Sequence, residues 1–306
     1  MTQSLHYSIH EVEPYISWSY FFHAWGFPAR FADIAQIHGC DSCRAMWLAR
    51  WPEAERARAA EAMQLHKEAQ RLLFFLDQRG FRVHVRFGLF ECNSEGEDIE
   101  IYHLPFNDSP FNLSFLRQQN GDYLCLADFI RPANPEGLHD RIGVFCAAAD
   151  EAIEHLYEEG TKDADEYKHL LCQTLADRLA EAATERAHQA IRKHYWGYAS
   201  DEELAISDLL AERFQGIRPA VGYPCLPDQS LNSDLDRLIN FSAIGIRLTE
   251  NGAMQPHASV SGLMIAHPEA HYFAIGPIGE DQFLDYAQRK GRNPEELRPF
   301  LAGNLD

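Results

Sequence analysis

The eight residues IRPAVGYP, at positions 217–224, decide how the rest of this chain is interpreted. Arg218 offers a planar guanidinium that can bind a carboxylate through two parallel hydrogen bonds. Pro219, Gly222 and Pro224 force the backbone into an irregular course that other groups can approach closely. This chemistry favours a ligand-binding loop over a strand or a helix. The alternative is a plain turn, in which Arg, Gly and Pro also occur together.

Composition limits the class of protein. The chain has 306 residues, enough to bury a substantial core in one large domain or two small ones. Its formal net charge of -19 makes nucleic acids and anionic membrane surfaces unsuitable partners. No stretch approaches the roughly 20 apolar residues of a membrane span, and residues 1–15 lack the basic and apolar regions of a signal peptide. We therefore expect a cytoplasmic protein whose seven cysteines are reduced thiols.

Apolar residues follow helix and strand periods in alternation along the chain. Helices are expected at 17–25, 52–78, 150–195 with a break near Gly160, 201–214, 234–241, 281–290 and 294–301. Strands are expected at 81–91, 98–104, 122–130, 140–149, 244–248, 259–266 and 272–275. Paired strands interrupted by helices of unequal length predict an α+β fold with an antiparallel sheet. No repeat or flexible linker divides the chain, so we expect one domain over 1–306, with an aromatic and helical region at 1–80 and a core at 81–306.

Three features of the sequence each have two interpretations. Glu181 lies at the rim of the apolar face of a long helix, where it can contact a ligand or simply be solvated. The aromatic residues of 18–25 can stack on a flat ligand or pack in the core. Asp128, inside an apolar run, is either an acid with a raised pKa or the cap of a turn.

Cys40 and Cys43 form a Cys-x-x-Cys motif with His38 close by. Such a motif can bind zinc, but one pair does not complete a tetrahedral site, and the sequence contains no second pair. Thioredoxin-like redox chemistry is not favoured either, because no strand precedes the pair as a βαβ unit requires. The sequence therefore predicts no metal site and leaves the role of Cys40 and Cys43 open.

Three longer segments surround the loop: LADRLAEAATERAHQAIRKHYWGYA (175–199), LTENGAMQPHASVSGLMIAHPEAHYFAIGPI (248–278) and DQFLDYAQRKG (281–291). In this order and at these distances they closely resemble the C-terminal activation domain of cobalamin-dependent methionine synthase. The likeness extends from about residue 15 to about residue 305. It implies a single C-shaped α+β domain with a twisted antiparallel sheet flanked by helices, and it implies that this domain binds S-adenosylmethionine.

The resemblance also implies which residues bind the cofactor. The implied cofactor-binding residues are Arg218, Ala220, Gly222, Tyr223, Tyr272, Phe273, Glu181 and Ser17. In these roles Arg218 would bind the ligand's carboxylate, while Glu181 would attract its ammonium and sulfonium groups. Ser17 is a departure, because the family usually has an aspartate there that contacts the ligand's amino group. A hydroxyl in that place forfeits a charge-assisted hydrogen bond of about 1.5–3 kcal/mol, and Glu13, about one turn away, is a candidate substitute.

Activation domains of this family serve a repair step. When the cob(I)alamin carried by methionine synthase is oxidised to cob(II)alamin, a flavodoxin-like reductant reduces it and S-adenosylmethionine remethylates it. The resemblance implies that this chain supports the step, in methionine biosynthesis, by positioning S-adenosylmethionine, with no catalytic acid or base of its own. The Asp-x-His-x-x-Gly motif of cobalamin-binding domains is absent, so a partner would carry the cobalamin and the chain would not turn over alone.

Two questions about function stay open at this point. The start at residue 1 favours a separately encoded subunit over the C-terminal piece of a longer enzyme. Ser17 favours an alternative function, in which the chain is a non-catalytic docking partner that protects a corrinoid protein and binds S-adenosylmethionine weakly or not at all.

Overall fold

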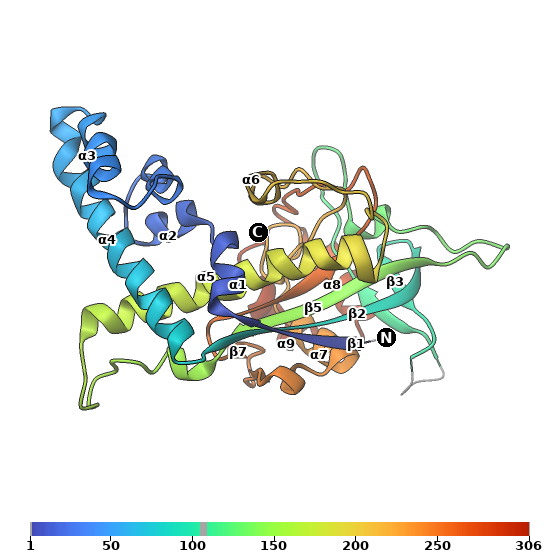
Figure 1. Ribbon diagram of the computed structural model, residues 1–306. Helices are drawn as coiled ribbons and strands as arrows, with labels where there is room; N and C mark the ends of the chain where they lie inside the picture. Colours follow the sequence, from blue (N-terminus) through green and yellow to red (C-terminus); the bar gives the residue numbers. More distant parts are fainter. Residues whose placement is uncertain (1, 105–108, 306) are drawn as a thin grey trace.

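One antiparallel sheet runs through the middle of the computed structural model, which describes residues 2–104 and 109–305 (Figure 1). Its strands are β1 (Thr2–Ser8), β2 (Arg82–Glu95), β3 (Asp98–Ile101), β4 (Phe111–Ser114), β5 (Asp140–Ala149) and β8 (Ser259–Met264). They follow the order β4, β3, β2, β5, β8, and β1 pairs with the first half of β2. A separate ribbon consists of β6 (Arg247–Leu248) and β7 (Met254–Gln255). The α+β class expected from the sequence, with a curled antiparallel sheet flanked by helices, is confirmed.

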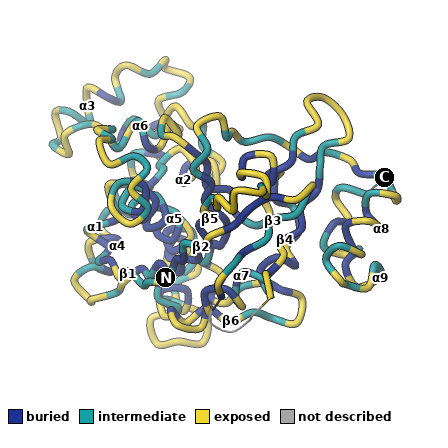
Figure 2. The backbone as a smooth tube through the Cα atoms, turned by 90° about the vertical axis from the view of Figure 1, so that its right-hand side faces the viewer, coloured by how far each residue is buried: buried dark blue, intermediate teal, exposed yellow. Residues whose placement is uncertain are grey.

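Strand β5 is the centre of the fold. It pairs with β2 on one side and with β8 on the other, and from Ile142 to Ala149 it is buried on both faces. Phe145 and Ala147 belong to one hydrophobic cluster, whereas Val144 and Cys146 belong to another. Alternate residues of a strand point to opposite faces, so an uninterrupted apolar run is what a strand covered on both faces requires. Figure 2 shows the buried backbone gathered in α5 and the central strands.

Helices cover both faces of this sheet. The α-helices are α1 (Ile9–Val12), α2 (Trp18–Ala24), α3 (Asp41–Ala49), α4 (Glu53–Gln78), α5 (Glu166–Ala190), α6 (Ile206–Leu210), α7 (Leu231–Ile239), α8 (Glu280–Arg289) and α9 (Pro294–Leu297). Shorter helical turns are η1 (Glu13–Tyr15), η2 (Ala29–Gln36), η3 (Leu126–Phe129), η4 (Glu151–Ile153), η5 (Ile191–Tyr195), η6 (Phe241–Ile244) and η7 (Arg298–Leu301). Residues of α4 and α5 join the cluster of Phe145, and residues of α7 join that of Val144. In Figure 1, α4 extends away from the sheet and carries α3 at its far end.

Local chemistry explains where α5 begins and which side it buries. The carboxylate of Asp165 accepts a hydrogen bond from the Lys168 N–H over 3.1 Å and so caps the first turn. Leu171, Leu175 and Leu179 form the buried stripe that their spacing predicts. This helix crosses the sheet and is the element on which the candidate site is built.

Several predicted elements are wrong in detail. Residues 122–130 form no strand; Asp128 accepts a hydrogen bond from the Cys125 N–H over 2.8 Å and turns the backbone into η3. Asp128 also pairs with Arg117, so the turn-cap interpretation is correct. The long helix begins at Glu166 rather than near 150, and residues 272–275 are not a strand. Strands β1, β4 and β7 were not expected, because β4 and β7 are very short and β1 contains few apolar residues, so that each carries little signal.

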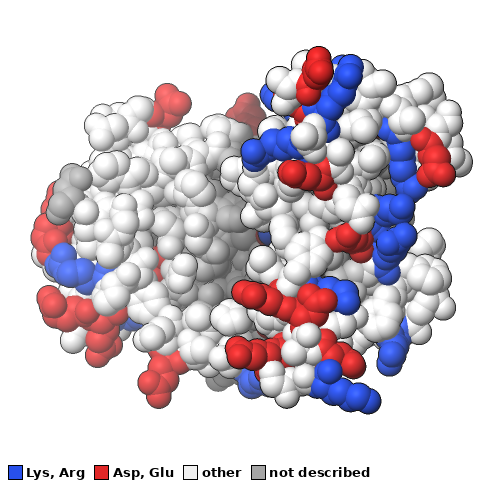
Figure 3. Space-filling model, turned by 90° about the vertical axis from the view of Figure 1, so that its left-hand side faces the viewer, with Lys and Arg blue, Asp and Glu red and all other residues white. Residues whose placement is uncertain are grey.

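Charged side chains of both signs lie over the surface. Figure 3 shows Lys and Arg side chains along one side of the face that it presents, with Asp and Glu side chains among them. Helix α4 carries four basic residues (Arg56, Arg58, Lys67 and Arg71) and five acidic ones (Glu53, Glu55, Glu61, Glu68 and Asp77), so it has no excess of positive charge. Within the described residues, no helix combines the length and apolar character needed to cross a membrane.

Candidate functional site

A cavity of about 530 Å³ lies where the N-terminal segment, α5 and the loop at 217–224 meet. Residues far apart in the sequence converge on it. Five of the eight residues implied by the sequence line this cavity: Ser17, Glu181, Arg218, Tyr223 and Tyr272. The fold therefore brings most of the expected residues to one place.

The loop at 217–224 begins with backbone hydrogen bonds to β8 and to the residue that follows it. The Ile217 N–H donates to the Ile265 carbonyl over 2.9 Å, and the Ile265 N–H donates back over 3.0 Å. Further along, the Val221 N–H donates to the Ser261 carbonyl over 2.9 Å. Paired backbone of this kind holds Arg218 on a rigid support.

Gly262 of β8 allows the loop to approach so closely. A Cβ at this position would stand 2.8 Å from Ala220 Cα and would also press against the Pro219 carbonyl oxygen. Neither atom belongs to a flexible side chain, so any larger residue would displace the loop. The glycine in SVSGLM (259–264) is thus part of the site, although it does not line the cavity.

Gly222 turns the loop out of its pairing with β8. Its φ of +94° lies in a region that L-residues rarely adopt, whereas the atom nearest to a Cβ added here would be Gln229 Nε2, at an unstrained 3.8 Å. Glycine is therefore required at position 222 by the backbone conformation and not by a lack of space for a side chain. The Tyr223 N–H donates to the Ala220 carbonyl over 3.0 Å and closes the turn that places Tyr223 at the cavity.

Arg218 is the electrostatic centre of the site. Its side chain is only 5% exposed, donates a hydrogen bond to Glu185, and lies 3.9 Å from a carboxylate oxygen of Glu181. Burial alone would lower the pKa of Arg218, but the charges of Glu185 and Glu181 outweigh burial and raise it. One cation and two carboxylates leave the cluster with an excess of negative charge, which suits a ligand that carries a positive group.

Several polar atoms of this cluster are unpaired. Nε and Nη1 of Arg218 and Oε2 of Glu185 are buried and have no hydrogen-bond partner among the residues that the structure describes. Buried polar atoms normally have partners, and leaving one without a partner costs about 1–3 kcal/mol. Free guanidinium donors beside a free carboxylate oxygen fit a ligand that has both a carboxylate and a cationic group.

Two tyrosines border the same cavity. The rings of Tyr223 and Tyr272 lie 6.3 Å apart, and the hydroxyl of Tyr272 accepts a hydrogen bond from the Arg218 N–H over 3.1 Å. Burial, followed by the charge of Glu181, raises the pKa of Tyr223 to about 12. Both phenols therefore stay neutral and offer aromatic surface together with a hydroxyl group.

Ser17 is the N-cap residue of α2, but its side chain makes no capping hydrogen bond. It lines the cavity and also a neighbouring groove of about 970 Å³. Glu13, considered above as a substitute for the family's aspartate, lines the groove and not the cavity. The structure therefore does not place the Glu13 carboxylate where the aspartate is expected.

The other implied residues lie around the cavity without lining it. Ala220 is a buried residue of the loop, and Gly222 contributes its backbone conformation. The ring of Phe273 packs 6.4 Å from that of Phe129. These three positions shape the site through the backbone or through packing.

Eight further lining residues are not among the implied cofactor-binding residues, namely Tyr15, Tyr20, Arg178, Glu185, Leu210, Ala211, Glu212 and Pro224. For Glu185 a signal existed, because it follows Glu181 by four residues and so lies on the same side of α5. For Glu212 no signal existed, because only the tertiary fold brings the turn after α6 to the cavity. Its φ of +55° is uncommon for a residue other than glycine, and backbone of this kind tends to occur at functional sites.

The aromatic residues of α2 divide between the two interpretations. Phe21 and Phe22 are completely buried and pack in the core, as the more ordinary interpretation holds. Tyr20 is 66% exposed and lines the cavity. The segment is therefore mainly structural, with one aromatic side chain left for the site.

His188 is completely buried, and neither of its ring nitrogens has a hydrogen-bond partner in the described part of the chain. Burial, then the charges of Arg192 and Arg218, hold its pKa well below 6.5. The folded protein therefore keeps His188 neutral, while the unfolded chain takes up a proton below pH 6.5 or so. Stability is thus fully present above that pH and is lost as the pH falls, by about 1.4 kcal/mol per pH unit.

We expect His188→Phe to remove this loss. In urea denaturation at pH 7.5 and 5.5, the wild type should lose more unfolding free energy between the two conditions than the variant does. His194→Phe changes an exposed histidine six residues further along the chain. It is the matched control and should behave like the wild type. Equal losses in the wild type and His188→Phe would contradict the assignment.

Comparison with known proteins agrees with this geometry. The family model described as "Vitamin B12 dependent methionine synthase, activation domain" matches residues 8–291. The chain is also similar to a solved structure, the crystal structure of the MetH reactivation domain bound to AdoHcy. The two share 34% sequence identity with a TM-score of 0.84, over 100% of this chain and 90% of the other.

Proposed function

The chain belongs to the family of vitamin B12-dependent methionine synthase activation domains, and we propose that its cavity binds S-adenosylmethionine for the repair of a cobalamin carried by a separate partner. The observation that carries the proposal is that Nε and Nη1 of Arg218 are unpaired beside Glu181 and beside the free oxygen of Glu185. S-adenosylmethionine has a carboxylate that Arg218 can bind, and an ammonium and a sulfonium that Glu181 and Glu185 can attract. The similar MetH reactivation domain was solved with AdoHcy, which supports a ligand of this class.

Each residue has a role that follows from its position. Arg218 binds the carboxylate through a free N–H of its guanidinium, and Glu181 and Glu185 hold the cationic end of the ligand. Tyr223 and Tyr272 hold the adenosine by aromatic contact and hydrogen bonding. Ala220 and Gly222 set the course of the loop, and Phe273 fixes the segment that carries Tyr272.

The chain needs no catalytic acid or base for this task. When bound, S-adenosylmethionine supplies a methyl group on a sulfonium, which is an excellent leaving group. The protein contributes position and orientation, and the walls of the cavity exclude water from the charged contacts. A flavodoxin-like reductant and the cobalamin-binding domain or subunit of methionine synthase are the partners in this proposal.

Calorimetric titration of the purified chain tests the proposal. We expect saturable binding of S-adenosylmethionine and of S-adenosylhomocysteine at one site. The absence of binding heat for both ligands would favour the alternative function, a docking partner that protects a corrinoid protein. Complex formation with a cobalamin-carrying domain of methionine synthase, measured with and without S-adenosylmethionine, then distinguishes a working module from a passive partner.

Ser17→Asp is expected to strengthen S-adenosylmethionine binding roughly 10- to 150-fold. The added carboxylate would accept a charge-assisted hydrogen bond of about 1.5–3 kcal/mol from the ligand's ammonium group. The comparison is made by titration against Ser19→Asp, which adds the same charge at an exposed position of α2 outside the cavity. No gain for Ser17→Asp, or an equal gain for both variants, would show that Ser17 does not contact the ligand.

A further inference from the structure

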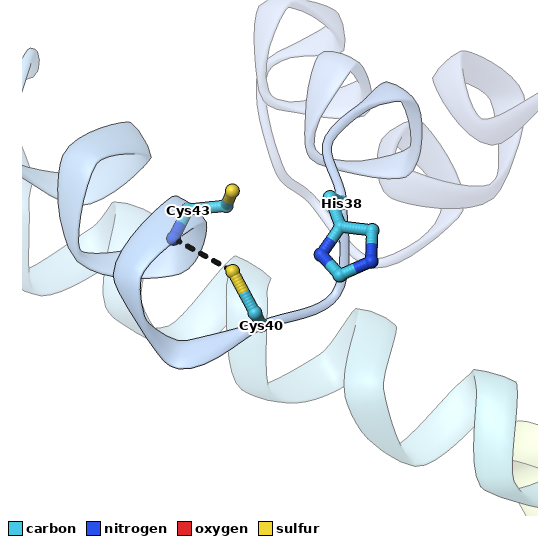
Figure 4. Close-up of side chains that lie close together, drawn as sticks. All are labelled: His38, Cys40 and Cys43. Carbon is cyan, nitrogen blue, oxygen red and sulfur yellow. Dashed lines mark hydrogen bonds between the residues drawn. The ribbon is translucent and has the colours of Figure 1, made fainter.

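Three metal-ligating side chains that the proposed function does not use lie at the start of α3, at the far end of α4 (Figure 4). His38, Cys40 and Cys43 each offer one ligand atom, and all three atoms lie within 4.8 Å of one another. They come from the loop between η2 and α3 and from the first turn of α3. We propose that these three residues bind one Zn²⁺ ion, with a water molecule in the fourth position.

The donor set suits zinc. Thiolate and imidazole are the ligands that zinc prefers, at about 2.3 Å for sulfur and 2.0–2.1 Å for nitrogen. Two thiolates would neutralise the charge of the ion, so binding leaves little net charge to solvate. A tetrahedral site with three protein ligands and one open position is a known arrangement for this metal. Small side-chain rotations suffice to bring atoms already this close onto one ion.

The backbone already supports the first thiolate. Cys40 is the N-cap residue of α3, and its sulfur accepts a hydrogen bond from the Cys43 N–H over 3.4 Å, drawn as the dashed line in Figure 4. Hydrogen bonds from outside the coordination shell orient a ligand and stabilise its charge. The helix holds Cys43 three residues further on, so both sulfurs face the same space as the ring of His38.

Packing on both sides fixes the loop that presents these ligands. Phe31 of η2 lies edge-on to Trp47 of α3 at 6.1 Å and to Trp51 at 4.7 Å. The Trp47 Nε1–H donates to the Asp33 carboxylate over 2.8 Å, which adds a second tie between η2 and α3. Ligands held between two packed elements lose little freedom when a metal binds.

The cluster is accessible and separate from the cavity. His38 is exposed, and Cys40 and Cys43 are half-buried, so an ion can enter from solvent. None of the three residues lines the cavity that contains Arg218. The other five cysteines are buried and belong to no metal-ligating group among the described residues.

A second group, Glu91, His103 and His139, is the main competitor for an added ion. All three residues are exposed, and His139 Nδ1 is already hydrogen-bonded to Asn93 over 2.7 Å. This second group contains no sulfur ligand. A sulfur-specific signal therefore distinguishes the two groups.

Cobalt titration of the whole chain provides that signal. The reduced protein is stripped with a chelator, titrated with Co²⁺, and then titrated with Zn²⁺. We expect one equivalent of Co²⁺ to give a sulfur-to-cobalt charge-transfer band and the intense visible bands of tetrahedral coordination, and Zn²⁺ to abolish both. Cys40→Ser and Cys43→Ser should each lose most of the charge-transfer band. His38→Ala should retain part of it and bind roughly tenfold or more weakly.

His103→Ala is the matched control and should leave the spectrum unchanged. Circular dichroism confirms that each variant is folded, and binding of S-adenosylmethionine should be unaffected because the cluster lies outside the cavity. The proposal is overturned if no charge-transfer band forms, if Cys40→Ser retains the full band, or if His103→Ala removes it.

Discussion

Replacing Arg218 with lysine is expected to weaken S-adenosylmethionine binding roughly 10- to 150-fold while the protein stays folded. Lysine keeps a positive charge beside Glu185 and Glu181, but its single ammonium group cannot reproduce the separate nitrogen donors of the guanidinium, one of which already binds Glu185. The loss of one charge-assisted hydrogen bond, about 1.5–3 kcal/mol, gives this range. Calorimetric titration of the variant and the wild type under the same conditions measures the change.

Arg218→Ala should abolish detectable binding, but it also removes the cation that faces Glu185, whose side chain is only 15% exposed. An unpaired buried carboxylate destabilises the protein, so the alanine variant alone would be ambiguous. The lysine variant separates loss of binding from loss of folding. Arg213→Ala, which removes a 69% exposed arginine outside the cavity, is the matched control. Wild-type affinity in Arg218→Lys would exclude the proposed carboxylate contact.

Glu202→Ala is expected to lower the free energy of unfolding by about 3–5 kcal/mol. Arg192 is completely buried, and its guanidinium donates to both carboxylate oxygens of Glu202, over 2.9 and 2.7 Å. The same guanidinium lies 4.1 Å from the ring of Phe214. Removing the carboxylate leaves the buried charge of Arg192 without its partner.

Urea denaturation followed by circular dichroism measures this change. Glu203→Ala removes an exposed carboxylate at the adjacent position and should alter stability by no more than about 0.5 kcal/mol. Similar small effects in Glu202→Ala and Glu203→Ala would mean that the Arg192 pair contributes nothing beyond a surface ion pair.

The fold class could be predicted because its central elements carry strong periodic signals. The run DRIGVFCAAA became β5, and the leucines spaced by four residues became the buried side of α5. The strand prediction at 122–130 was wrong because the Asp128 side chain accepts a hydrogen bond from the Cys125 N–H and turns the backbone. The apolar pattern of this segment gives no sign of that hydrogen bond. The spacing of apolar residues predicts which side chains are buried, but it does not predict hydrogen bonds between a side chain and the nearby backbone.

The site could be predicted only in part, for a similar reason. Loop chemistry and family resemblance located Arg218, Tyr223 and Tyr272, all of which line the cavity. Glu212 depends on a turn that approaches from elsewhere in the fold, and Gly262 acts through the space it leaves for the loop. The roles of Glu212 and Gly262 depend on segments that are distant in the sequence, so no local pattern identifies these two residues.

The position of β8 in the sheet has a consequence for how the protein is made. Gly143 of β5 pairs with Met264 of β8, and the cavity joins Tyr15 to Tyr272. Contacts between residues so distant in sequence form slowly, and on the ribosome they must wait until most of the chain has emerged. Until then β5 presents an unpaired apolar edge that invites aggregation. A chain that still lacks β8 therefore has no partner for that edge of β5, and the ligand can bind only after the segment that carries Tyr272 is in place.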